Sequence, residues 1–213
     1  MRDEWYRSPD WDAEAQEDFE LRLRRARPGN RQQYLNIKAL ALLDAGHEDD
    51  AVRLLHRSID CGTTAGDTAF GWERLGDLAA RHGRIDEAVA FYERVLREQP
   101  SLSGTSGSVE ISLAEVLIAT REEARIEEAI TYLDAWITRK GLKLDDALFR
   151  WFLAHIDVSE AIGDHVTAAR SARSALELAG RGPRLTRQPD VGIVHTDDLT
   201  LKRLRRMAGA DAG

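Results

Sequence analysis

A short segment that recurs about every forty residues constrains the fold of this chain more than any other feature. The sequence Arg-Ile-Asp-Glu-Ala at residues 84–88 returns as Arg-Ile-Glu-Glu-Ala at residues 125–129, with looser copies at 47–51 and 164–168. The alanines that end these copies are 37, 41 and 39 residues apart. A period of about 40 residues, with helical periodicity inside each repeat, predicts helix-turn-helix units stacked as a solenoid.

Each copy of the segment has the composition of a helix start. Acidic residues in a first turn face the positive end of the helix dipole, and the small alanine lets a neighbouring helix approach closely. Gly46, Gly83 and Gly163 lie five residues before their alanines, where glycine tolerates the left-handed conformation that ends a helix. The third repeat has Ala124 at this place, so we expect a less regular turn there.

The second repeat carries the fullest pattern. It reads Trp72-x-x-Leu75-Gly76-x-x-Ala79, followed by Gly83, Ala88, Tyr92, Val95 and Pro100. This pattern resembles the tetratricopeptide repeat (TPR), whose signature is Trp-x-x-Leu-Gly-x-x-Tyr, a later Ala-x-x-x-Phe-x-x-Ala and a closing proline. The resemblance is close over residues 69–102 and extends more weakly over residues 31–180. It implies a right-handed superhelix in which the first helix of every pair lines a concave surface.

Two flanking segments complete the predicted array. Residues 8–10, Ser-Pro-Asp, predict the start of a helix that ends near residues 28–29. We therefore expect an N-terminal capping helix in residues 1–30, four TPR-like helix pairs in 31–180, and a basic arm and helix in 181–213. In that arm, residues 191–194 either form a short strand or pack along the last helix. The predicted fold class is all-α, an α-solenoid of about ten helices forming one structural domain.

The charge of the chain is unevenly distributed. The formal net charge is −7, and residues 181–213 hold seven cations and four acids, which leaves −10 for residues 1–180. An acidic body argues against broad nucleic-acid binding, which needs a basic stripe. The basic last helix, with Lys202, Arg203, Arg205 and Arg206, either contacts nucleic acid or an acidic partner, or complements its own helix dipole.

The sequence offers little for catalysis or metal binding. Its six histidines show no His-Glu-x-x-His spacing, and Cys61, the single cysteine, cannot build a multi-cysteine zinc site. Residues 101–108 resemble a phosphate-binding loop in composition but lack the lysine that follows such loops, so we interpret them as a flexible connector. We therefore expect no catalytic residues, no metal ligands, no cofactor and no enzymatic activity.

Polar side chains on the first helices are the remaining candidates. The TPR resemblance places these residues in the concave groove: Asn36, Arg74, Asp77, Arg81, Glu115, Arg121, Arg150 and Asp157. Arg74, Asp77 and Arg81 are three and four residues apart, so they share one helical face. Arginine among mixed charges suits an extended peptide that carries carboxylates. Alternatively, these charges form a solvated face with pairs inside each helix. Asn36 matches one member of the lysines and asparagines in the family's chaperone-binding clamp, but Leu40 and Arg74 do not match the next two, so chaperone tails are not predicted as ligands.

These observations predict a non-catalytic protein–protein interaction module, an adaptor or a regulatory subunit that binds a peptide segment or partner protein in the groove. The alternatives are a self-assembling scaffold and a bacterial regulator that senses a small ligand or peptide. Trp5, Tyr6 and Trp11 either anchor a partner or pack on the capping helix, and we favour packing. The sequence has no apolar run long enough to span a membrane and no visible signal peptide, so we expect a cytoplasmic protein.

Overall fold

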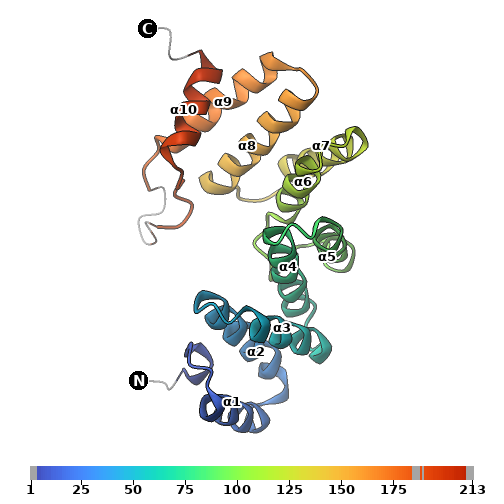
Figure 1. The fold of residues 1–213 in the computed structure, drawn as a ribbon, viewed down its shortest axis with the longest axis vertical. Coiled ribbons are helices and arrows are strands. Elements are labelled where there is room, and N and C mark those ends of the chain that lie inside the picture. The colour runs from blue at the N-terminus through green and yellow to red at the C-terminus, as the bar shows by residue number, and fades with distance from the viewer. Residues whose placement is uncertain (1–3, 184–187, 189, 210–213) are drawn as a thin grey trace. The chain divides into compact units, whose positions relative to one another are not determined.

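A computed structural model of the protein describes residues 4–183, 188 and 190–209, and every regular element in this part of the chain is a helix (Figure 1). The elements are η1 (Trp5–Arg7), α1 (Ala13–Arg25), α2 (Pro28–Asp44), α3 (Glu48–Cys61), α4 (Ala65–Arg81), α5 (Ile85–Glu98), α6 (Val109–Ala119), α7 (Glu123–Thr138), α8 (Asp145–Ala161), α9 (His165–Ala179) and α10 (Asp198–Ala208). The all-α prediction is confirmed. Three of the charged tail residues, Arg184, Arg187 and Asp211, lie outside the described residues.

Left-handed turn residues separate the helices of each successive pair. Gly46, Gly83 and Gly163 have φ values of +84°, +69° and +77°, and the next helix begins two residues after each of them. Between α6 and α7 the residue in this conformation is Arg121, with φ +59°, and α7 likewise begins two residues later. The turn of the third repeat thus differs from the other three: Ala124 lies inside α7, which starts six residues before Ala129, whereas α3, α5 and α9 start three residues before their alanines.

The chain forms two compact units, Met1–Val109 and Glu110–Gly213, which are described separately. In the first unit α2 packs against α3, α3 against α4, and α4 against α5. The repeated alanines Ala51 and Ala88 are fully buried. Gly76 is required by this packing, because a Cβ atom there would lie 2.6 Å from Cε1 of Tyr92.

The N-terminal segment differs in detail from its prediction. The helix does not begin at residues 8–10: α1 starts at Ala13, where the Asp12 side chain accepts a hydrogen bond from the Ala15 amide. Residues 28–29 do not end α1 but open α2, since Pro28 occupies the first turn, where its missing N–H costs nothing. Trp5 and Tyr6 contact the ring of Tyr34 at centroid distances of 5.3 and 4.6 Å, so these aromatics pack internally, as favoured.

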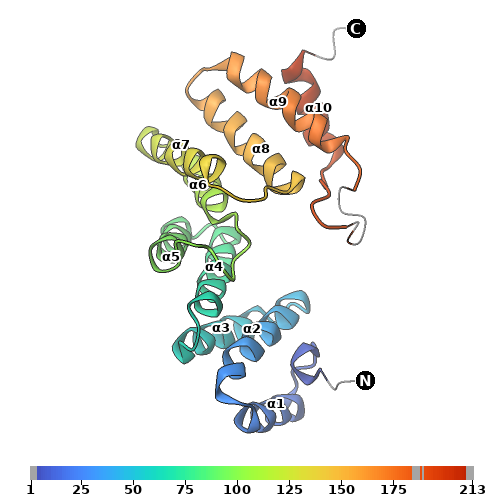
Figure 2. The same cartoon turned by 180° about the vertical axis from the view of Figure 1, so that it is seen from behind.

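In the second unit, α7 packs against α8, α8 against α9, and α9 against α10 (Figure 2). An ion pair of 3.1 Å between Arg139 and Glu110 joins the end of α7 to the start of α6. Leu204 of α10 is fully buried in an apolar cluster with α8 and α9 residues. Val194 packs against the same cluster and residues 191–194 form a turn and an irregular segment, so the packing alternative holds rather than the strand.

The boundary between the units falls after the second of the four predicted repeats. The division into 1–30, 31–180 and 181–213 rests on the repeat pattern and stays a prediction. Across the described ranges, no helix has both the length and the apolar composition needed to cross a membrane.

Candidate functional site

Two of the predicted groove residues form an ion pair on α4. A guanidinium nitrogen of Arg74 lies 3.0 Å from a carboxylate oxygen of Asp77, so the predicted proximity of these two residues is confirmed. The other oxygen of Asp77 accepts a hydrogen bond of 2.8 Å from the Tyr92 hydroxyl on α5. The side chains of Arg74 and Asp77 are 27% and 30% exposed. They are therefore oriented by the fold but still open to solvent on one side.

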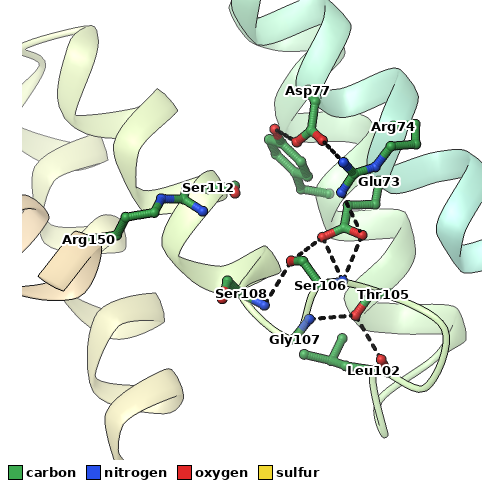
Figure 3. A network of polar contacts seen from close by, with 11 residues as sticks. Glu73, Arg74, Asp77, Leu102, Thr105, Ser106, Gly107, Ser108, Ser112 and Arg150 are labelled. Carbon is green, nitrogen blue, oxygen red and sulfur yellow. Dashed lines mark hydrogen bonds and ion pairs between the residues drawn. The ribbon is translucent and has the colours of Figure 1, made fainter. Parts of the chain in front are cut away.

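A third α4 residue, Glu73, was not a candidate and is the best-buried charge of this cluster (Figure 3). Its carboxylate accepts hydrogen bonds from the backbone amide of Ser106, at 2.9 Å, and from the Ser106 hydroxyl. It also lies 3.1 Å from Arg74. The sequence signal for this burial is the spacing of Glu73, four residues after Ala69 and three before Gly76, which both lie on the packed face of α4.

The contacts of Glu73 also change the interpretation of residues 101–108. We expected a flexible connector, but in this loop the Ser106 hydroxyl accepts a hydrogen bond from the Ser108 amide and Leu102 is buried. The loop also approaches α4 closely, since a Cβ atom on Gly104 would lie 2.4 Å from the carbonyl oxygen of Gly66. The connector is thus attached to α4 by a buried carboxylate.

The other two candidates of the first unit lie in different environments. Asn36 is buried, and its amide nitrogen donates a hydrogen bond of 3.0 Å to the carbonyl oxygen of Asp67. This contact joins α2 to α4, so the structure places Asn36 in a helix interface and not on an open surface. Arg81 is exposed at the last position of α4.

In the second unit, Arg150 of α8 forms a forked ion pair with Glu115 of α6. Its Nη2 and Nε atoms lie 2.6 and 3.2 Å from the two Glu115 carboxylate oxygens, and Nη2 also donates to the Ser112 hydroxyl at 3.1 Å. The Arg150 side chain is 42% exposed. The guanidinium is therefore fixed in orientation and remains accessible.

The remaining candidates of this unit are Asp157 and Arg121. Asp157 and Glu160, one turn apart on α8, both accept hydrogen bonds from Arg203 of the C-terminal helix α10. Burial lowers the pKa of Arg203, but its hydrogen bonds to Asp157 and Glu160 and the negative charges of these two carboxylates outweigh burial. The pKa of Arg203 is therefore raised above its usual value. Part of the basic tail thus contacts the chain's own α8. Arg121 is exposed in the left-handed turn before α7.

Among the histidines, His155 has the most distinctive surroundings. Its ring stacks on Trp151 at a centroid distance of 4.7 Å, and Nδ1 lies 3.0 Å from the Ser171 hydroxyl. Burial lowers the pKa of His155, and Ser171 is itself buried. Within the part of the chain that the structure describes, no three histidine, cysteine or acidic side chains are grouped so that they could hold a metal ion.

Comparison with known proteins gives a likeness of fold. No protein-family model matches the sequence, and no curated protein matches it. Among solved structures, the crystal structure of BtubC (BKLC) from P. vanneervenii is similar, with a TM-score of 0.61 and 17% sequence identity. The similarity covers 91% of this chain and 80% of BtubC. At this identity the likeness concerns the fold alone.

Proposed function

We propose that this protein is a non-catalytic interaction module, an adaptor or regulatory subunit, that binds a peptide segment of a partner protein along the first helices of its repeats. The observation that carries the proposal is that Arg74 and Arg150 are both oriented by the fold and partly exposed to solvent. Each guanidinium is held by a carboxylate of its own chain while 27% and 42% of the side chains remain exposed. An arginine that is already oriented loses less side-chain entropy when it binds a ligand carboxylate.

The proposal also takes the four helix pairs to be TPR-like repeats in a right-handed superhelix. The recurrence near forty residues and the left-handed turns at Gly46, Gly83 and Gly163 support this assignment. The single cysteine of the chain fits a reducing compartment, and we place the protein in the cytoplasm.

A triple variant tests the groove and leaves the buried contacts of Glu73 intact. Arg81→Ser and Arg121→Gly change exposed residues, and Arg150→Gln removes the positive charge that is paired with Glu115. Arg74 is left in place because it contacts the buried Glu73. Affinity purification from the native host followed by quantitative mass spectrometry should recover a partner with the wild-type protein and lose it with the variant.

The matched control replaces three exposed arginines at or on second helices, Arg53→Ser, Arg84→Ser and Arg97→Ser. This control should capture the partner as the wild-type protein does. Equal recovery with the groove variant and the wild-type protein would show that the partner binds elsewhere.

A further inference from the structure

Five arginines and no acidic residue lie between positions 22 and 31 of a chain whose net charge is −7. In the structure this segment is the last turn of α1, the connection, and the first turn of α2. We call it the arginine corner, and it consists of Arg22, Arg24, Arg25, Arg27 and Arg31. In Figure 1 it lies in the blue part of the ribbon, where α1 leads into α2.

Most of the charge of the arginine corner is uncompensated. Arg22 is paired with Asp18 at 2.8 Å, and Arg31 donates to the backbone carbonyl oxygens of Arg24 and Ala26, which are neutral groups. Arg24, Arg25 and Arg27 are exposed, and none of them forms an ion pair with an acid of the described residues. Three free guanidinium groups therefore lie within four residues of each other.

The helix ends do not account for this charge. The carboxyl end of α1 carries the equivalent of about half a negative charge, which is far less than the arginines supply. The amino end of α2 adds positive potential at the same place, because its N-cap residue Arg27 provides no side-chain hydrogen bond to the first turn. The corner is thus built to attract an anion.

A hollow of about 350 Å³ opens beside the arginine corner, between α1, α2 and α3. Leu23 and Leu35, both buried, form its apolar lining, and its charged lining residues are three arginines, Arg24, Arg31 and Arg57, and two acids, Glu20 and Asp60. Arg57 forms a forked ion pair with Glu20, at 2.6 and 3.0 Å, whereas Arg24 and Arg31 form no ion pair with the acids of the described residues. The hollow thus combines an apolar lining with an excess of one cationic group over the acids at its edge, and a few charged groups around an apolar hollow are typical of a small recognition site.

We propose that the arginine corner binds a short acidic peptide segment of a partner protein, with one apolar side chain of that segment in the hollow. A long polyanion fits less well, because acidic residues bound the corner on α1. Glu17 lies seven residues before Arg24, which is about 10 Å along a helix, and Glu14 and Asp18 are exposed nearby. The site is separate from the proposed groove residues and does not depend on that function.

Fluorescence anisotropy with a defined probe tests the site. The probe is a fluorescein-labelled pentapeptide of four acidic residues around a central leucine. The corner variant combines Arg24→Glu, Arg25→Glu and Arg27→Glu, which are exposed positions, and we expect its dissociation constant for the probe to be about tenfold higher or more. A probe with glycine in place of leucine should bind the wild-type protein about threefold more weakly or worse, because the hollow then stays empty.

The matched control is Lys202→Glu, Arg205→Glu and Arg206→Glu on α10, which changes the net charge equally at exposed positions. It should bind the probe within about twofold of the wild-type protein, because screening over a Debye length of about 10 Å confines each charge to its neighbourhood. Unchanged binding by the corner variant, an equal loss in both variants, or no measurable binding by the wild-type protein would each overturn the proposal. If the wild-type protein binds a single-stranded DNA oligonucleotide more tightly than the peptide probe, the proposed peptide ligand is wrong and nucleic acid is the better candidate.

Discussion

At the scale of single residues, Arg121 has a backbone conformation that the other three turns give to glycine. Its φ of +59° brings Cβ close to the following carbonyl group, at a cost of about 1–2 kcal/mol for a residue other than glycine. We predict that Arg121→Gly stabilises the protein by about 0.5–1 kcal/mol, since the greater freedom of glycine in the unfolded chain offsets part of the gain. Urea denaturation at equilibrium measures this change.

The same variant separates folding from recognition. If Arg121 contributes to partner binding, Arg121→Gly gains stability and loses partner capture, a combination that a purely structural residue cannot give. Unchanged or lower stability in urea would contradict the assigned strain at this turn.

Residue identity also shows where sequence reasoning succeeds and where it stops. Gly46, Gly83 and Gly163 were predicted as turn residues because a positive φ selects glycine locally. Asn36 was placed on an open groove but is buried against Asp67, because the depth of a polar side chain depends on a helix 31 residues away. Local rules identify turns, whereas burial is decided by which helices meet.

At the scale of the elements, the attachment of residues 101–108 to α4 depends on one carboxylate. Both oxygens of Glu73 accept hydrogen bonds from Ser106, and Arg74 is a further neighbour. In Glu73→Gln the side-chain amide N–H group would face the Ser106 amide and hydroxyl, which are themselves donors. We therefore predict a loss of about 1–3 kcal/mol in the free energy of unfolding. Hydrogen exchange should show a faster Ser106 amide in this variant.

Glu93→Gln provides the control for Glu73→Gln, because it makes the same chemical change at a partly exposed position of α5. Its stability should stay within about 0.5 kcal/mol of the wild-type value. If the two variants are equally stable, the buried contacts of Glu73 do not hold the loop.

Some helix boundaries were predicted less accurately than the turns at glycine, and the reasons are physical. Proline at residue 28 was interpreted as a stop signal, yet the same residue is well suited to a first helical turn, and only the contacts of α2 select that role. The start of α7 was missed because Arg121 gives no compositional sign of a left-handed turn. The charge of Glu73 was visible in the sequence, but its hydrogen bonds to Ser106 were not.

At the scale of the whole molecule, each of the two units has its own buried residues. In the first unit, a methyl group added at Gly76 would collide with the Tyr92 ring, and such overpacking costs about 1–3 kcal/mol. We predict that Gly76→Ala lowers hydrogen-exchange protection in α4 and α5 and leaves α8 and α9 unchanged, because stability in repeat arrays is largely local.

Gly29→Ala is the control for Gly76→Ala, since a Cβ atom at residue 29 meets no neighbour within 4 Å. It should leave the protection of α4 and α5 at the wild-type level. An equal loss of protection in α4 and α8 on Gly76→Ala would mean that the two units unfold as one cooperative body.

The contact of Arg203 with Asp157 and Glu160 has a consequence for ligand choice. Because Arg203 belongs to the same chain, it competes with free ligands for these two carboxylates at a local concentration of about a millimolar. A basic peptide would therefore have to displace Arg203 before it could bind them. Asp157 and Glu160 of α8 are thereby occupied from within the chain, whereas the Arg150 guanidinium on the same helix remains 42% exposed. We therefore expect α8 to bind anionic ligands in preference to cationic ones.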